Sequence, residues 1–313
     1  MKNLHGHSRC AAFRWAAGSN RAPGCATTGA TSQRMQHRNQ RYSLFTNLVS
    51  MITVEFLQPK DVASMGVSIL DDLTAEQAIL DDLVHSLDEA RWVTPTPAEG
   101  WSVRDQIAHL AMFDDVATTS LTGGGEARFA EILAAVNSGD TGFIDTPAGD
   151  RPGAEVLSAW RQARDGAAVA FRRIDPTTRV PWGPNLMSAV SLCTARLMET
   201  WAHGLDCFAA LGVQPVDTNR LRHVCHITYR AIPYALLRSG VAKPAAIDDL
   251  VVEVSSPEGA IWRFGRWGAP NRIDGTASEF ARVGVRRMRL EESALRAQGP
   301  LAEVALRNLK AYL

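Results

Sequence analysis

The sequence predicts a mainly α-helical protein, in which a four-helix bundle is followed by a small α+β module. Apolar residues at helical spacing recur through residues 65–240, and short alternating strands replace that pattern afterwards. Four long helices with two extended connections fit a bundle better than a solenoid, and no internal repeat is visible. We therefore expect an N-terminal extension over 1–64, the bundle over 65–240 and the module over 241–313.

The N-terminal extension differs from the rest of the chain in charge. The first fifty residues contain seven Lys or Arg and no acid, which leaves 26 basic and 33 acidic residues for the remainder. Such a composition is typical of an organellar transit peptide, but it also fits a disordered or wrongly translated extension with the working start at Met51 or Met65. We favour the extension. The acidic remainder argues against nucleic-acid binding through a basic surface.

Four long helices are expected over 67–91, 101–113, 154–174 and 187–211, with a shorter one over 129–136 and a further one over 220–237. Ser102, followed three residues later by Asp105, forms a capping-box-like start for the second of them. Asp217 is expected to cap the last one, and Pro233 to bend it. Segments rich in glycine and proline, 138–153 and 175–185, are expected to be loops.

The last seventy residues predict the α+β module. Two strands joined by a Ser-Pro-Glu-Gly turn are expected over 249–264, and a third over 272–278 leads into a helix. A final helix is expected over 301–313. A module of this size is small enough to need the bundle as a packing partner. No run of 18 or more apolar residues occurs, so no membrane span is predicted.

Two histidines and a glutamate form a candidate metal site. Glu199 and His203 are four residues apart, so on a helix they project from one face, one turn apart. His109 lies in the apolar run 107–113, where a buried imidazole needs a partner. These residues leave two alternatives open. They are either a solvated surface pair and a satisfied core histidine, or three ligands from two helices.

The motifs around these residues carry a family resemblance. Trp101-Ser-Val, five residues and His109-Leu, together with Met198-Glu-Thr-Trp-Ala-His-Gly-Leu-Asp206, resemble the mycothiol-dependent maleylpyruvate isomerase-like proteins of actinobacteria. These are metal-binding members of the DinB-like four-helix-bundle superfamily. The resemblance begins near residue 65 and implies that His109, Glu199 and His203 hold the metal. It also implies a sterol-carrier-like C-terminal domain.

More narrowly, the chain resembles an uncharacterised actinobacterial branch of that group, sometimes labelled as wyosine-base-formation proteins. Thr94-Pro-Thr-Pro-Ala-Glu-Gly-Trp101 and Met187-Ser-Ala, followed by Arg196-Leu-Met-Glu, resemble that branch in particular. The label implies RNA chemistry. The acidic body and the lack of a basic aromatic surface do not support that chemistry.

Two imidazoles and a carboxylate suit Zn²⁺, with Ni²⁺, Fe²⁺ or Co²⁺ as alternatives, and leave a coordination position open. That position can take a thiol or water. The resemblance favours mycothiol as cosubstrate, whose thiolate adds to a small electrophilic substrate. Addition, bond rotation and elimination would give isomerisation, whereas loss of a leaving group would give thiol transfer. A hydrolase that uses bound water and a non-catalytic metal- or ligand-binding protein are the alternatives.

Three neighbouring residues are candidates for supporting roles. Asp206 could orient an imidazole, as metal-bound histidines need. Arg196 could bind a substrate carboxylate or form a salt bridge at the bundle edge. Cys207, four residues after His203, could be a fourth ligand, which would close the site.

Other residues could border the same cavity. His223 and His226 are three apart on the following helix, and Trp182 and Gly183 lie in the connection before the Glu199 helix. A loop tryptophan packs against its own domain just as often. Five cysteines without a Cys-x-x-Cys motif favour a reducing cytoplasm. The oligomeric state is not predicted.

Overall fold

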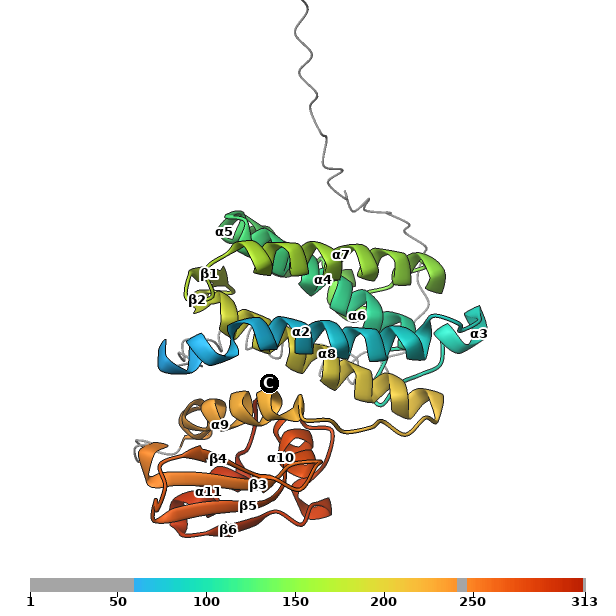
Figure 1. Cartoon of the computed structure of the whole chain (residues 1–313). Coiled ribbons are helices and arrows are strands. Elements are labelled where there is room, and N and C mark those ends of the chain that lie inside the picture. The colour runs from blue at the N-terminus through green and yellow to red at the C-terminus, as the bar shows by residue number, and fades with distance from the viewer. Residues whose placement is uncertain (1–58, 241–246, 312–313) are drawn as a thin grey trace, which may run out of the picture. The chain divides into compact units, whose positions relative to one another are not determined.

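A computed structural model describes residues 59–240 and 247–311 (Figure 1). The expectations for residues 1–58 lie outside this range. The predicted boundary at residue 64 falls inside the first helix, α2 (Pro59–Val84). A proline suits the first turn of a helix, because the N–H that it lacks has no intrahelical partner there.

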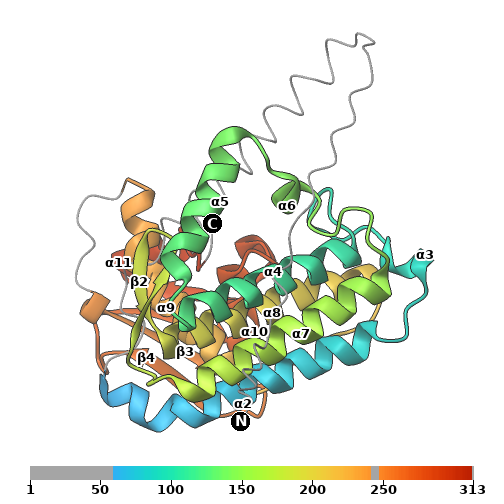
Figure 2. The ribbon, with the colours of Figure 1, turned by 90° about the horizontal axis from the view of Figure 1, so that it is seen from above.

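Four long helices form the predicted bundle (Figures 1 and 2). They are α2, α4 (Val103–Leu121), α7 (Gly153–Arg173) and α8 (Ala189–Leu211). α4 packs against α7 and α8, and α2 packs against the same two helices, so each helix has two neighbours. The mainly helical fold class is therefore confirmed. Among the residues in the range above, no helix combines the length and the apolar composition needed to cross a membrane.

The start of α4 follows the predicted capping chemistry. The Asp105 N–H donates to Ser102 Oγ at 3.3 Å, and the Ser102 N–H donates to the Asp105 carboxylate at 2.9 Å. Just before it, Gly100 has a φ of +77°, a conformation that favours glycine. This residue lets the chain turn back toward the helix start.

The first predicted helix is split. α2 ends at Val84, and Asp88 caps a separate short helix, α3 (Glu89–Trp92). The Asp88 carboxylate accepts from the Arg91 N–H at 2.8 Å. Because an N-cap residue has extended backbone, here with a ψ of 166°, one helix cannot run through it.

The connections contain more structure than predicted. α5 (Gly125–Ser138) contains the shorter helix predicted over 129–136 and extends it at both ends. The short α6 (Gly142–Asp145) follows it, and a hairpin of β1 (Arg179–Trp182) and β2 (Asn185–Ser188) precedes α8. The hairpin lies where a loop was expected. Its four-residue strands are too short for alternation to stand out, although Val180 and Trp182 are both buried.

The C-terminal module is a four-stranded sheet with helices packed against it. Its strands are β3 (Leu250–Ser255), β4 (Ile261–Gly265), β5 (Asn271–Thr276) and β6 (Arg296–Gln298), in the order β4-β3-β5-β6. β3 is antiparallel to β4 and parallel to β5, and β5 is antiparallel to β6. The helical elements packed with the sheet are α10 (Ala277–Gly284), α11 (Pro300–Arg307), η1 (Ile247–Asp249) and α9 (Leu221–Arg238), of which α9 was predicted within the bundle region, and η2 (Leu290–Glu292) precedes β6.

The small sheet module is confirmed, with three differences from the prediction. β6 was missed because it is only three residues long, and α11 ends earlier than expected, at Arg307. Asp217 does not cap α9 but pairs with Arg282 at 2.8 Å. α9 contacts both α8 and α10, and one apolar core runs from the bundle into the module.

Candidate metal site

Three predicted ligand residues lie together between α4 and α8. The Nε2 atoms of His109 and His203 are 3.5 and 3.2 Å from Oε2 of Glu199. One ligand atom from each residue lies within 4.8 Å of the others, and no second such group occurs in the part of the chain that the structure describes. The side chains are 12 to 14% exposed, so the site is mostly shielded but reachable from solvent.

Two levels of structure bring these residues together. Helix geometry alone stacks Glu199 and His203 one turn apart on α8. His109 joins them because α4 packs against α8, with Ile107 and Leu110 fully buried on α4. The site therefore depends on bundle packing for its third member.

The protonation of the cluster suits metal binding. Burial and the neighbouring His203 together lower the pKa of His109 to about 4, against the opposing effect of Glu199. Burial would raise the pKa of Glu199, but hydrogen bonds from His109 and His203 outweigh it and hold that pKa well below its usual range. At neutral pH the cluster thus offers a neutral imidazole and a carboxylate, the forms that coordinate a metal. The donor set fits a Zn²⁺-type ion.

Gln106 and Trp101 complete the surroundings of the two imidazoles. Oε1 of Gln106 lies 2.5 Å from Nδ1 of His203. The Trp101 ring lies 5.0 Å from the His109 ring and stacks on His203 at 5.9 Å, and its indole N–H donates to the Ile144 carbonyl at 3.2 Å. Neither residue was predicted for the site. The available signal was position, since both flank the start of the helix that carries His109.

Comparison with known proteins places the chain in a family. The family model described as the mycothiol maleylpyruvate isomerase N-terminal domain matches residues 73–208, which include all three clustered residues. Two Mycobacterium tuberculosis proteins, uncharacterized protein Rv0036c of strain H37Rv and uncharacterized protein MT0041 of strain CDC 1551, are each 38% identical over 244 residues. The match covers 77% of this chain and 93% of each relative. The chain belongs to the mycothiol maleylpyruvate isomerase family.

Solved structures of a mycothiol-dependent maleylpyruvate isomerase and of a mutant of that enzyme are also similar to this family member. They share 15% and 14% identity with it, at a TM-score of 0.48 for each. Each comparison covers 75% of this chain and 95% of the solved chain.

Asp206 pairs with an arginine in the structure, whereas it was expected to orient an imidazole. Its carboxylate accepts from Nη2 of Arg287 at 2.7 Å and from Nε at 3.2 Å. Nδ1 of His203 lies 2.5 Å from the amide oxygen of Gln106 on α4, and the Asp206 carboxylate is engaged by Arg287.

Arg196 shows the salt-bridge alternative, although the bridge is buried and not at the bundle edge. Its Nε donates to Oδ1 of Asp114 at 2.8 Å, and both side chains are 1% exposed. Trp160 donates to the other carboxylate oxygen at 3.2 Å. Arg196 is therefore held inside the bundle of this isomerase-family chain, one helical turn from Glu199.

Cys207 is not part of the ligand group. It is fully buried in an apolar cluster with Leu80 and Val84, and burial raises the pKa of its thiol. An uncharged thiol in apolar surroundings is a poor ligand. Three candidate ligands match in number the pattern of catalytic zinc sites, in which a further position is left for water or substrate.

The remaining candidates lie elsewhere. His223 pairs with Asp72 at 2.7 Å, and the His226 ring packs against Phe264 in the module. Burial lowers the pKa of His223, and its pairing with Asp72 opposes that shift. Trp182 is buried against two phenylalanine rings, so it packs within its own domain.

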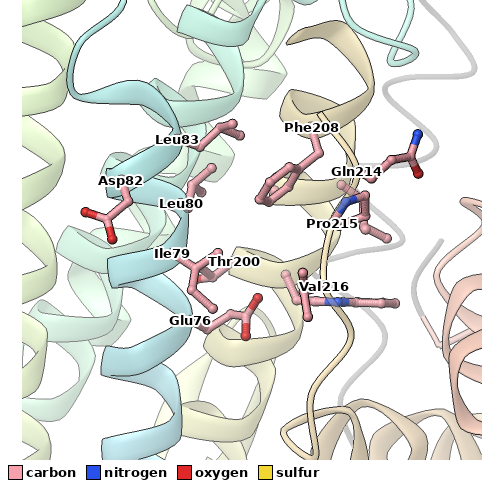
Figure 3. A pocket seen from close by; sticks show the side chains of 13 residues that line it. Glu76, Ile79, Leu80, Asp82, Leu83, Thr200, Phe208, Gln214, Pro215 and Val216 are labelled. Atoms are coloured by element: carbon pink, nitrogen blue, oxygen red, sulfur yellow. The ribbon is translucent and has the colours of Figure 1, made fainter. Parts of the chain in front are cut away.

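A separate pocket lies between α2, α8 and the segment after α8 (Figure 3). It has a volume of about 410 Å³, and most of the side chains that line it are apolar, including Leu80, Phe208 and Val216. Glu76 at its edge pairs with Arg220 at 2.7 Å. None of the three clustered residues, His109, Glu199 and His203, lines this pocket.

Proposed function

We propose that this chain is a divalent-metal-dependent enzyme that uses mycothiol to act on a small electrophilic substrate, as an isomerase or a thiol transferase. The main support is the grouping of His109, Glu199 and His203 on two helices within the family-matched region. Membership of a mycothiol-dependent isomerase family supports the thiol and favours isomerisation.

In this proposal His109, Glu199 and His203 hold the ion. A bound divalent ion supplies the positive charge that keeps a thiol ionised at neutral pH. Glu199 contributes one negative charge, and His109 enters as a neutral donor, so the site keeps a net positive charge when loaded. Trp101 covers the side of both imidazoles, which limits access of water from that direction.

A hydrolase that uses bound water is the second candidate, because the same three ligands serve both chemistries. The two candidates differ in their need for a thiol. A thiol-dependent enzyme is inactive without added mycothiol, whereas a hydrolase is indifferent to it.

The test combines metal content with thiol binding and turnover. The full-length chain is purified, reconstituted with Zn²⁺, and compared with a His109→Ala, His203→Ala double variant. His85→Ala serves as the control, because His85 is exposed and is not one of the clustered residues. Mycothiol binding is measured by calorimetry with and without metal, and turnover is measured first with maleylpyruvate.

We expect one ion per chain in the wild type and in the control, and none in the double variant. Thiol binding should disappear together with the metal. A wild-type protein that stays metal-free after reconstitution overturns the proposal. Turnover of ester or amide substrates without any thiol would favour the hydrolase.

A further inference from the structure

We propose that Gln106 is a positioning residue that presents Nε2 of His203 to the metal, and that Thr96 sets the orientation of Gln106. This inference rests on the proposed metal site. It adds two polar residues whose side chains do not contact the ion. They form a chain of hydrogen bonds that begins in the loop before α4 and ends at His203.

Gln106 is fully buried on α4, one turn before His109. Its Oε1 lies 2.5 Å from Nδ1 of His203, and its Nε2 lies 2.8 Å from Oγ1 of Thr96. An amide can present either its oxygen or its nitrogen to a given neighbour. The orientation therefore has to be decided by the groups around it.

Thr96 decides the orientation. Its hydroxyl has one hydrogen, which it donates to the carbonyl of Trp101 at 2.8 Å. With that hydrogen engaged at the Trp101 carbonyl, Thr96 Oγ1 accepts from the amide nitrogen of Gln106 at 2.8 Å. The amide oxygen then faces His203.

The tautomer of His203 follows from this orientation. Because an amide oxygen has no proton to give, Nδ1 of His203 must carry the hydrogen and donate it to Gln106. Nε2, which lies 3.2 Å from Glu199, is then the nitrogen left to coordinate an ion once the metal replaces its hydrogen bond to Glu199. A fixed ring orientation also removes the rotation that a free histidine loses on binding metal.

The backbone of the loop holds Thr96 in place. The Thr96 N–H donates to the Trp101 carbonyl at 2.8 Å, and the Val103 N–H donates to the Thr94 carbonyl at 3.0 Å. Pro95 and Ser102 form an isolated β-bridge between these bonds. These bonds fix the loop against the start of α4. They therefore hold the hydroxyl of Thr96 beside Gln106.

The experiment measures Zn²⁺ affinity of the full-length chain by competition with a chelator. Gln106→Met removes the acceptor at similar length and should weaken Zn²⁺ binding about 10- to 100-fold, the usual effect of losing an outer partner of a ligand. Gln106→Glu keeps an acceptor at the same place and should bind at least as tightly as the wild type. Gln77→Met, at a buried glutamine on α2, is the control for packing and should leave the affinity unchanged.

A second pair of variants tests the orientation without touching His203. Thr96→Val removes the hydroxyl and should weaken binding in the same direction as Gln106→Met, but less. Thr96→Ser keeps the hydroxyl and should match the wild type. This pair preserves the test if Gln106→Met does not fold.

Nuclear magnetic resonance of the Zn²⁺-loaded protein supplies a readout that a purely structural role would not change. The Nδ1–H of His203 should give a downfield imidazole signal protected from exchange in the wild type and in Thr96→Ser. That signal should exchange faster in Thr96→Val. A wild type that binds no metal overturns the proposed function itself. A wild type that binds Zn²⁺ with no change of affinity in Gln106→Met and Thr96→Val overturns only the inference about positioning.

Discussion

Asp114→Asn should destabilise the bundle strongly, because it leaves a buried cation without its anion. Asp114 and Arg196 are each 1% exposed and are joined at 2.8 Å. Asparagine keeps the shape and can still accept from Trp160, but it carries no charge. A guanidinium does not lose its proton in proteins, so the positive charge stays buried. Breaking a buried pair in this way costs about 3–5 kcal/mol of unfolding free energy.

Arg196→Met should behave differently, because the carboxyl that it leaves behind can take up a proton. Burial already raises the pKa of Asp114, against the opposing effect of Arg196. Without Arg196 that pKa rises further. A carboxyl with a raised folded-state pKa loses stability as the pH rises above its unfolded value of about 3.9, by up to about 1.4 kcal/mol per pH unit. The variant should therefore be closest to the wild type near pH 4 and weakest at alkaline pH.

Urea unfolding of the full-length chain at pH 5 and pH 8 measures both effects. Asp82→Asn, at an exposed position of α2, is the matched control and should change stability by less than about 0.5 kcal/mol. An Arg196→Met, Asp114→Leu double variant should be less destabilised than the Asp114→Asn single variant, because no charge is left unpaired. If Arg196→Met keeps wild-type stability at both pH values and only weakens substrate binding, Arg196 faces a ligand and our reasoning about the ion pair is refuted.

Three further predictions concern the metal, one close contact and one buried carboxylate. Zn²⁺ at 100 times its Kd should raise the unfolding free energy by about 2.7 kcal/mol in the wild type and not in His109→Ala, as measured by urea unfolding with and without chelator. Gly153→Ala should destabilise by about 1–3 kcal/mol, because a Cβ there would lie 2.2 Å from the Trp92 ring, whereas Gly142→Ala, with open space around it, should be neutral by thermal melting. The arginine partners of Asp81 lower its pKa, so the stability that it contributes is present above its unfolded pKa and is lost as the pH falls through its folded value. Asp81→Asn should remove that acid dependence in unfolding titrations between pH 2 and 5.

Local patterns were sufficient for most of the fold. The 3.6-residue spacing located the four bundle helices, and the capping box at Ser102 and Asp105 located the start of α4. Short elements were not predicted, including the β1–β2 hairpin and β6, because a strand of three or four residues shows too little periodicity in the sequence. The end of the first helix at Val84 was not predicted either, because Asp88 is one of several acidic residues in this segment and its capping role cannot be distinguished from the sequence.

The candidate site, like the fold, could be predicted from the sequence only in part. The spacing of Glu199 and His203 placed both side chains on one helix face, because one helix sets their geometry, but it left open whether they are metal ligands or a solvated pair. His109 needed an additional argument, from its apolar surroundings and from a family resemblance, since it lies on another helix. That the three residues lie together is an observation, whereas metal binding stays a prediction.

What the sequence determined by itself was the four bundle helices, the family resemblance and the composition of the candidate ligand group, because these depend on spacing and residue type. Only the tertiary structure decided how the neighbouring polar residues are paired. Arg196 pairs with Asp114, Asp206 with Arg287 and His203 with Gln106, each across 81 to 97 residues of chain. No local pattern encodes such pairings. The pairings depend on which helix faces pack together. A polar group that is buried in such an interface then needs a hydrogen-bond partner within the same interface.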